Sequence, residues 1–256
     1  MSLYKNNKIL IDNYFENRQV DEIAIQSFLQ KYHANELEFI KAEQKQQSLS
    51  KSVELVHYHA EFVCFQDVVQ IQHCASGRLL SAFVDDIAIP NSVSCTITAS
   101  ESSTPCVRTA FYVVRDEEAM KQYVADFDDR FSPNDSILRY GQKFHIVAHP
   151  ELCSHQLALY SELKSFRAFS KASNKQILCL HAPVRSLSSF VIVHPDPDFA
   201  LEMEGEPVRR GESFIIKHAQ TGSVIDCGDA RVYTDISVDV ETFCCKFNNK
   251  SLWKLL

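Results

Sequence analysis

Three stretches of the chain, Phe65-Gln-Asp-Val-Val-Gln-Ile71, Tyr140-Gly-Gln-Lys-Phe-His-Ile146 and Arg210-Gly-Glu-Ser-Phe-Ile-Ile216, follow one pattern. Each begins as a turn and continues as an alternating strand, in which the last residue and the residue two before it point to one face. A pattern that returns in order along a chain is the signature of a repeated architecture.

A hairpin signal and a second strand follow each stretch, at Ser76-Gly77-Arg78-Leu79, Ser154-His155-Gln156-Leu157 and Thr221-Gly222-Ser223-Val224. The first apolar residue of this second strand comes 14, 17 and 14 residues after the start of its motif. Each copy then ends on a strand with an aromatic residue, in Phe111-Tyr-Val-Val114, Phe190-Val-Ile-Val193 and Leu252-Trp253-Lys-Leu255. Three copies of one unit therefore span about residues 65–116, 140–196 and 210–256.

The glycines support the repeat independently of the apolar pattern. The chain has only six, and four of them fall at corresponding turn positions: Gly77, Gly141, Gly211 and Gly222. Glycine is favoured where the backbone turns tightly or φ is positive. No copy could bury its apolar face alone, so we predict a mainly β domain in which the copies close around one axis as a β-trefoil.

The trefoil domain is expected over residues 53–256, behind an N-terminal arm of residues 1–52. Apolar residues at helical spacing predict a helix over 18–46 of the arm, with Asn17 as its N-cap and a break at His33-Ala34-Asn35. Because an isolated amphipathic helix is marginal in water, the arm is expected to dock either on the trefoil or on a partner.

A helical insert over residues 116–135 separates the first copy from the second. Apolar residues at i, i+3, i+4 and i+7 predict a short helix over 116–131 with one buried face, formed by Met120, Tyr123, Val124 and Phe127. A proline-rich connection over 195–209 separates the second copy from the third.

Charge and composition exclude several classes of protein. The 256 residues hold 26 Lys and Arg against 33 Asp and Glu, a net charge of −7, which disfavours binding to nucleic acid or to an anionic membrane. We find no signal peptide and no stretch long enough to span a membrane. The nine cysteines are odd in number and scattered among apolar runs, which indicates reduced thiols and a cytoplasmic protein.

Four clusters offer candidate metal ligands: His57-x-His59 with Cys64, His73-Cys74, Cys153-x-His155 and Cys244-Cys245. None has the ligand spacing of a structural zinc site. The pair His57 and His59 would share one face of a strand and offers at most a weak site. Two acidic clusters, His194-Pro-Asp196-Pro-Asp198 and Asp126/Asp128/Asp129, lack the pattern of a calcium loop. We therefore predict no metal site.

Enzymatic motifs are also missing. The sequence has no G-x-S-x-G nucleophile elbow, no P-loop and no G-x-G-x-x-G fingerprint. Arg209-Arg210 and Arg231 are too few for an anion-binding patch. We expect a non-enzymatic protein with no catalytic and no cofactor-binding residues.

Several blocks resemble one family across about residues 137–256: Ser136-Ile-Leu-Arg-Tyr-Gly-Gln-Lys-Phe144, Leu157-Ala-Leu-Tyr-Ser161, Phe199-Ala-Leu-Glu-Met-Glu-Gly-Glu-Pro-Val208 and Phe214-Ile-Ile-Lys-His218. They are similar to the cilia- and flagella-associated protein 161 family. The N-terminal segment Ile11-Asp-Asn-Tyr-Phe-Glu-Asn17 resembles it more loosely. The family's Gly-Asn-Trp motif reads Asp12-Asn13-Tyr14 here, and its first Tyr-Gly pair reads Phe65-Gln66.

The resemblance implies a MIR-like trefoil with a structural role. It implies a microtubule inner protein in the A-tubule lumen of ciliary and flagellar doublet microtubules, part of the axonemal cytoskeleton. The implied partners are tubulin and neighbouring inner proteins. The alternative is a trefoil that binds a carbohydrate or an inositol phosphate, although the repeat loops offer one arginine, Arg78, and no tryptophan.

Overall fold

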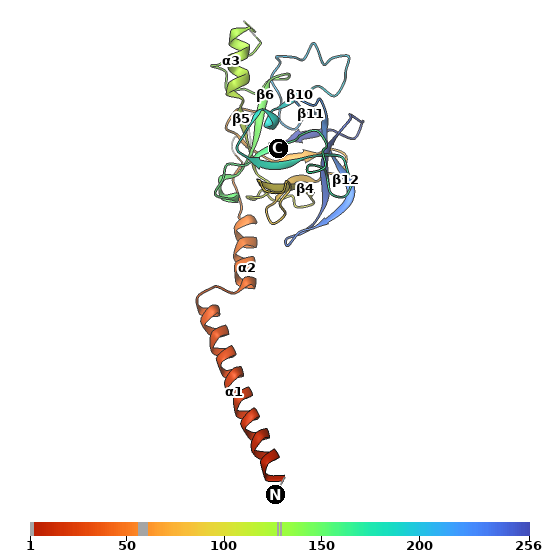
Figure 1. The fold of residues 1–256 in the computed structure, drawn as a ribbon. Coiled ribbons are helices and arrows are strands. Elements are labelled where there is room, and N and C mark those ends of the chain that lie inside the picture. The colour runs from red at the N-terminus through yellow and green to blue at the C-terminus, as the bar shows by residue number, and fades with distance from the viewer. Residues whose placement is uncertain (1–2, 56–60, 127, 129) are drawn as a thin grey trace. The chain divides into compact units, whose positions relative to one another are not determined.

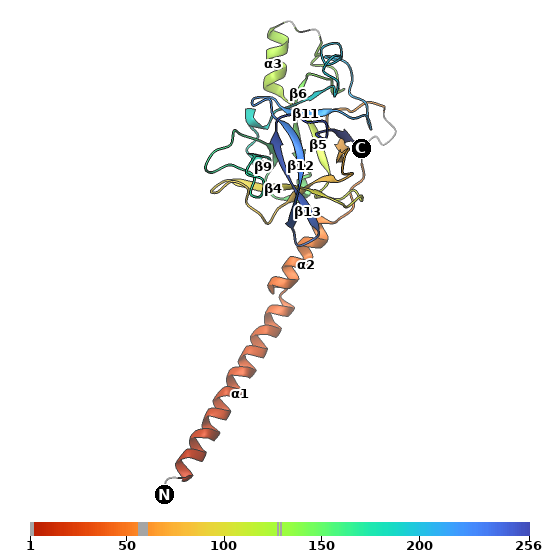
Figure 2. The ribbon, with the colours of Figure 1, turned by 90° about the vertical axis from the view of Figure 1, so that its right-hand side faces the viewer.

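The computed structural model describes residues 3–55, 61–126, 128 and 130–256, shown as a ribbon in Figures 1 and 2. The chain divides into a helical part, Met1–Ser48, and a β part, Leu49–Leu256. The division lies four residues before the boundary expected from the sequence, after residue 52, because Leu49 already belongs to the hydrophobic core of the β part. Among the described residues, no helix is both long and apolar enough to cross a bilayer.

The helical part contains α1 (Leu3–His33) and all of α2 (Glu38–Leu49) except its last residue. The predicted break is confirmed: Asn35 has φ +56°, a conformation that Asn tolerates better than most residues. The predicted start at residue 18 is wrong, because α1 begins at Leu3 and runs through Asn17. No proline or glycine lies between residues 3 and 33, so nothing in the backbone forces a helix end where the sequence offered a cap.

Each repeat of the β part contributes its own set of strands. The first holds β1 (Val68–Val69), β2 (Ile71–His73), β3 (Leu79–Phe83), β4 (Val93–Ser100) and β5 (Phe111–Arg115). The second holds β6 (Lys143–Ala148), β7 (Ala158–Tyr160), β8 (Gln176–Ile177), β9 (Cys179–Ala182) and β10 (Phe190–Val193). The third holds β11 (Ile215–His218), β12 (Val224–Tyr233), β13 (Val238–Cys245) and β14 (Trp253–Leu255). Two short 3-10 helices, Pro150–Leu152 and Ser186–Ser188, lie in the second repeat.

The strand pairing is equivalent in the three repeats. The first hairpin of each is antiparallel, as β2–β3, β6–β7 and β11–β12, and so is the second, as β3–β4, β7–β9 and β12–β13. Strands of the second hairpins also pair between repeats, as β4–β9, β4–β13 and β8–β13. The three copies therefore make the same contacts, each with the next.

The remaining pairings close a barrel. From β1 the ring runs through β5, β6 and β10 to β11. It returns through the Phe214–Trp253 bridge and the β14–β2 pairing. The expected mainly β fold with a closed barrel is thus confirmed, and closure leaves no long unpaired edge in this ring.

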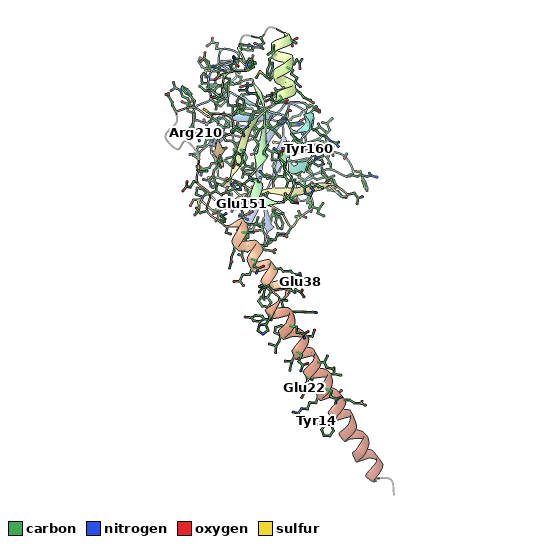
Figure 3. The ribbon with its side chains drawn as sticks, turned by 90° about the vertical axis from the view of Figure 1, so that its left-hand side faces the viewer. Tyr14, Glu22, Glu38, Glu151, Tyr160 and Arg210 are labelled. Carbon is green, nitrogen blue, oxygen red and sulfur yellow. The ribbon has the colours of Figure 1, made fainter. Side chains whose placement is uncertain are left out.

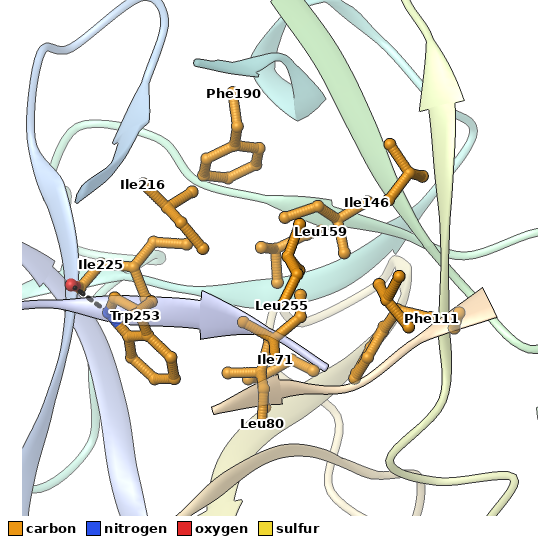
Figure 4. Packing of buried hydrophobic residues seen from close by; sticks show 14 of the residues in the cluster. Ile71, Leu80, Phe111, Ile146, Leu159, Phe190, Ile216, Ile225, Trp253 and Leu255 are labelled. Atoms are coloured by element: carbon orange, nitrogen blue, oxygen red, sulfur yellow. Dashed lines mark hydrogen bonds between the residues drawn. The ribbon is translucent and has the colours of Figure 1, made fainter. Parts of the chain in front are cut away.

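One hydrophobic cluster fills the barrel, and equivalent positions of the three repeats supply it (Figure 4). The strand after the first turn contributes Ile71, Ile146 and Ile216, the next strand contributes Leu80, Leu159 and Ile225, and the closing strand contributes Phe111, Phe190 and Trp253. All nine side chains are at most 1% exposed. The core is therefore shared between the repeats.

The turn before the first strand of each repeat has the same backbone shape. Gly141 and Gly211 have φ of +81° and +76°, as expected for glycine at this position. Gln66 holds φ +73° at the equivalent position of the first repeat. The departure from the family's Tyr-Gly pair thus leaves the turn unchanged in shape.

The insert forms α3 (Glu117–Ala125), which is shorter than the predicted 116–131. Asp116 caps it by accepting a hydrogen bond from the Ala119 amide at 3.0 Å. Met120 is buried as predicted, whereas Val124 is 54% exposed, so that part of the predicted buried face is wrong. The hydroxyl of Tyr123 instead accepts a hydrogen bond from the Lys143 amide at the start of β6. Phe127 lies outside the described residues.

Candidate functional site

A cluster of three ionisable side chains joins the first repeat to the third. His73 ends β2, while Asp226 and Cys227 are consecutive residues of β12. The register of β12 against β13 shifts between Cys227 and Arg231. An irregularity of this kind changes the direction of side chains from strict alternation. Both Asp226 and Cys227 reach the same imidazole ring.

The imidazole of His73 lies between the thiol and the carboxylate. Its Nδ1 is 3.1 Å from Sγ of Cys227 and 2.9 Å from Oγ of Ser76. Its Nε2 is 2.7 Å from the carbonyl oxygen of Lys250 and 3.5 Å from Oδ1 of Asp226. Thiol and carboxylate thus approach different nitrogens of one ring.

Further contacts fix the carboxylate. Oδ2 of Asp226 accepts a hydrogen bond from the amide of Asn248 at 2.7 Å, and Oδ1 accepts one from the backbone amide of Cys227 at 2.9 Å. The ring of His73 also packs against the indole of Trp253, with ring centroids 4.9 Å apart. The cluster is therefore attached to the hydrophobic core of the barrel.

These contacts favour the charged forms of both groups. Burial alone would lower the pKa of His73, but its hydrogen bonds to Asp226 and Cys227 outweigh burial and raise that pKa to about 9. Burial would raise the pKa of Asp226, but hydrogen bonds from His73, Asn248 and the Cys227 amide lower it to about 2. The pair is an imidazolium beside a carboxylate at neutral pH.

The cluster opens onto a cavity of about 1150 Å³. Its wall combines hairpin residues of the first repeat with residues of the β12–β13 hairpin and the loop before β14, among them Ser76, Arg78, Glu101, Gly228, Arg231 and Lys250. Both charge signs line it, so it suits a small polar molecule better than an extended anion. Because Cys227 is half-buried and lines this cavity, solvent molecules can reach its thiol.

The third repeat contains the same hairpin without the acid and the thiol. His218 occupies the position of His73: its Nδ1 is 2.9 Å from Oγ1 of Thr221, and its Nε2 is 3.0 Å from the carbonyl oxygen of Leu187. Burial lowers the pKa of His218, although the bond to the Leu187 carbonyl opposes this. The two histidines occupy equivalent turns, yet the pKa of His73 is raised and the pKa of His218 is lowered.

We expect the free energy of unfolding to fall by roughly 1–2 kcal/mol between pH 6.5 and pH 8 because of His73. Its folded pKa lies above the unfolded value of 6.5, so its stabilising effect is complete below pH 6.5 and is lost as pH rises towards 9. The depressed pKa of Asp226 acts only at the acid end, where stability is lost as pH falls from 3.8 towards 2. Urea denaturation at closely spaced pH values measures the slope.

The equivalent histidine of the third repeat, His218, provides the control. His73→Asn should remove the loss of stability above pH 6.5, whereas His218→Asn should retain it. The pKa of His218 is lowered in the folded state, so its contribution is lost below pH 6.5 rather than above it. A His73→Asn protein with the wild-type slope between pH 6.5 and pH 8 would show that His73 is neutral in the folded state.

Among the described residues, the other candidate metal ligands named from the sequence do not form a cluster of three or more. His57 and His59 lie outside the described residues. His73 turns to Cys227 rather than to its neighbour Cys74, and Cys153 donates to the backbone carbonyl of His155. Cys244 is buried and its neighbour Cys245 is only half-buried.

Three of the charged candidates are paired with opposite charges. Arg209 lies 3.5 Å from Glu61, and Arg210 forms an ion pair with the buried Asp67. Asp128 lies 2.8 Å from Arg130. Asp129 lies outside the described residues. These contacts provide counter-charges for Arg209, Arg210 and Asp128 within the chain.

The three residues of the His73 cluster are of types that also bind metals. The ligand atoms of His73, Asp226 and Cys227 lie within 4.8 Å of one another. Zinc needs its ligands at about 2.0–2.3 Å from a single centre. Here the thiol faces one ring nitrogen and the carboxylate faces the other. The arrangement is that of an imidazole shared by an acid and a thiol.

Sequence reasoning missed Asp226 and Cys227. A signal was present in His73-Cys-Ala-Ser-Gly77 and His218-Ala-Gln-Thr-Gly222, which share a His-x-x-Ser/Thr-Gly pattern. That pattern predicts two similar hairpins. It cannot name the residues of the neighbouring repeat that face each histidine.

The fold is similar to the folds of several solved structures. The chain is similar to a Caenorhabditis elegans protein of unknown function, with a TM-score of 0.57, 14% identity and coverage of 78% of this chain and 98% of that one. It is also similar to the SDF2-like protein of Arabidopsis thaliana, with a TM-score of 0.54, 11% identity and coverage of 76% and 94%. At these identities the likeness concerns the fold alone.

Comparison of sequences is more specific. The chain is 24% identical over 237 residues to cilia- and flagella-associated protein 161 of Danio rerio, an alignment that covers 86% of this chain and 74% of the relative. The family model of the cilia- and flagella-associated protein 161-like domain matches residues 41–234, which is most of the chain. The resemblance seen in the sequence is thereby confirmed, and the chain belongs to the cilia- and flagella-associated protein 161-like family.

Proposed function

We propose that this chain is a non-catalytic microtubule inner protein, which lies in the lumen of ciliary or flagellar doublet microtubules and binds tubulin and neighbouring inner proteins. Membership of the cilia- and flagella-associated protein 161-like family supports the association with cilia and flagella. The structural observation that carries the proposal is the apolar face of α1.

Helix α1 exposes large apolar side chains within the helical part, and Figure 3 shows Tyr14 standing clear of its ribbon. At 100° per residue, one face of the helix collects Tyr14, Ile25, Phe28, Leu29 and Tyr32. These side chains are between 45% and 63% exposed. Ile25, Phe28, Leu29 and Tyr32 are neighbours on this face, whereas Tyr14 lies about three turns nearer the N-terminus. Exposed apolar patches mark sites of association, so we name these five residues the apolar face of α1 and propose that it binds the microtubule lattice or an inner protein.

In the proposed assembly, the barrel is the rigid part of the protein. We propose that it is a β-trefoil of the MIR type. The equivalent pairings of the three repeats and the shared core support this assignment, as does the likeness to the SDF2-like fold. A barrel whose core is complete within its own repeats can hold loops in fixed positions against a lattice.

Two loops of the barrel provide further contact points. Phe166, between β7 and β8, is 97% exposed, and Leu201, between β10 and β11, is 81% exposed. Both are long apolar side chains on irregular segments, where exposure has an energetic cost unless a partner covers them. We propose that they lie against neighbouring proteins in the doublet.

The ligand-binding alternative has weaker support. Carbohydrate sites use exposed aromatic platforms, and the single tryptophan, Trp253, is fully buried. The guanidinium of Arg78, the arginine of the repeat loops, lies 2.5 Å from a carboxylate oxygen of Glu101. That pairing leaves it poorly placed to bind a phosphate. The scaffold role fits the surface better.

The proposal is tested by adding the full chain, with an epitope tag, to ciliated cells that lack the endogenous protein. We expect the protein to sediment with salt-washed axonemal doublets and to stay there until the doublets dissolve. The double variant Ile25→Glu/Phe28→Glu should lower the retained fraction by about tenfold or more, because central apolar contacts dominate binding energy.

Ser27→Glu/Gln30→Glu is the matched control. It adds the same charge to the same segment of α1, on the side away from the apolar face, and should leave retention unchanged. Release of the wild-type protein with the soluble matrix fraction would contradict the proposed location. Equal retention of both double variants would show that the apolar face of α1 is not the binding element.

A further inference from the structure

The cluster around Cys227 has a geometry that a structural role does not require. Its thiol, an imidazole and a carboxylate lie in a row, and Sγ of Cys227 is 3.1 Å from Nδ1 of His73. Nε2 on the far side of the ring is 3.5 Å from Oδ1 of Asp226. A thiol beside a base that a third group orients is the arrangement by which proteins activate cysteine as a nucleophile.

The ring is held in place from both ends. The carbonyl oxygen of Lys250 accepts a hydrogen bond from Nε2 at 2.7 Å, which leaves Nδ1 directed at the thiol. Oγ of Ser76 lies 2.9 Å from Nδ1 and 3.8 Å from Sγ. This hydroxyl can donate to a thiolate, so the sulfur has two polar partners in the charged state.

Other thiols of the described chain have surroundings that favour the neutral form. Burial raises the pKa of Cys244 to about 12 and is the main cause that raises the pKa of Cys245 to about 11. Cys179 is fully buried, and burial raises its pKa as well. Cys74 is exposed and its pKa is raised, again chiefly by burial of the sulfur. Cys227 differs because it lies against an imidazole.

Access to the sulfur is open. Cys227 is half-buried and lines the cavity of about 1150 Å³ described above, as do His73 and Ser76. The charged groups around it are of both signs: Arg78, Arg231 and Lys250 against Glu101, Asp226, Asp229 and Asp239. A small neutral reagent can therefore enter without a strong electrostatic barrier.

We propose that Cys227 is a reactive thiol that acts as a nucleophile beside the imidazolium of His73, and that it is the site at which hydroperoxides modify this protein. The thiolate sulfur attacks one oxygen of hydrogen peroxide, the O–O bond breaks, and a sulfur–oxygen bond forms. The departing hydroxide takes the proton from Nδ1 and leaves as water. Sulfur is oxidised to the sulfenic acid and the peroxide is reduced, with no further reactant.

Alkylation of the intact full-length chain tests the proposal. Iodoacetamide is added at a series of pH values, and the rate at each cysteine is followed by peptide mass spectrometry. At pH 6.5 we expect Cys227 to react at least about tenfold faster than the exposed Cys74 of the same molecule, because the imidazole of His73 lies against the sulfur of Cys227. Hydrogen peroxide followed by dimedone should label Cys227 first.

The variants separate activation from simple exposure. His73→Asn should lower the rate at Cys227 about tenfold at pH 6.5, whereas His218→Asn, in the equivalent hairpin, should not change it. If His73→Asn fails to fold, the wild-type profile still decides the matter. A rate at Cys227 that rises with pH in parallel with that of Cys74 would overturn the proposal, as would an unchanged rate in folded His73→Asn.

Discussion

Trp253→Ala is expected to lower the free energy of unfolding by about 4 kcal/mol, the largest effect of any single substitution we predict. The indole is fully buried where β14 closes the barrel, and its Nε1 donates to the Ile225 carbonyl oxygen at 2.9 Å (Figure 4). Truncation would open a cavity and leave that oxygen without its partner. A domain is stable by only about 5–15 kcal/mol, so much of its stability would be lost.

The measurement is guanidinium denaturation followed by far-UV circular dichroism. Fluorescence cannot be used for the variant, because Trp253 is the only tryptophan of the chain. Trp253→Phe is the matched control: Phe111 and Phe190 fill the equivalent positions of the other repeats, so the cost should be only about 1–2 kcal/mol. A cost below about 1 kcal/mol for Trp253→Ala would show that β14 is not part of the folded core.

The sequence predicts the barrel well because its signals are local. The alternation of Val69 and Ile71, and its copies at Phe144/Ile146 and Phe214/Ile216, follows from the two-residue period of a strand. The turns before these strands need a residue with positive φ, and the glycines at positions 141 and 211 indicate such a residue in the sequence. Gln66 gives no such signal, yet the flanking pattern was enough to locate the first repeat.

The helix boundaries were predicted less well because caps are weak signals. Asn17 lies inside α1, since an isolated cap residue costs little within an otherwise unbroken helix. At Val124, helical spacing placed the residue on the buried face, but only the packing of α3 on the barrel decides which part of that face is covered. Tertiary contacts override local pattern at both places.

The His73 cluster could not be predicted from the sequence because it depends on barrel closure. Cys227 lies 154 residues after His73, and only the meeting of the first and third repeats brings the two together. The two matching hairpin motifs identify His73 and His218 as equivalent. The residues opposite each ring decide its charge: Asp226 and Cys227 face His73, whereas the Leu187 carbonyl faces His218.

Asp239→Ala should have the second largest effect, a loss of about 3 kcal/mol of stability, because it leaves a buried guanidinium without its counter-charge. Asp239 is 0% and Arg108 is 2% exposed, where β13 meets β4. Nη2 of Arg108 lies 3.5 Å from Oδ1 of Asp239. The hydroxyls of Thr98 and Ser237 donate to the same carboxylate at 2.7 Å and 2.6 Å.

Removal of both charges should be less damaging than removal of one. In Arg108→Met/Asp239→Ala no charge remains buried, so the loss should be smaller than the sum of the two single losses by more than about 1 kcal/mol. Urea denaturation of the four proteins of this cycle gives the coupling energy. Additive losses would show that the guanidinium is solvated in the folded state and does not depend on Asp239.

An exposed ion pair of the same β part tests whether burial, rather than a short distance between the charges, causes the predicted loss of stability. Nζ of Lys51 lies 2.8 Å from a carboxylate oxygen of Glu151, closer than the 3.5 Å of the Arg108–Asp239 pair. Its side chains are 61% and 50% exposed, so water solvates each charge once its partner is gone. Glu151→Ala should therefore leave the denaturation midpoint unchanged. If it proved as harmful as Asp239→Ala, desolvation would not be the source of the predicted loss, and the shorter contact would be the stronger one.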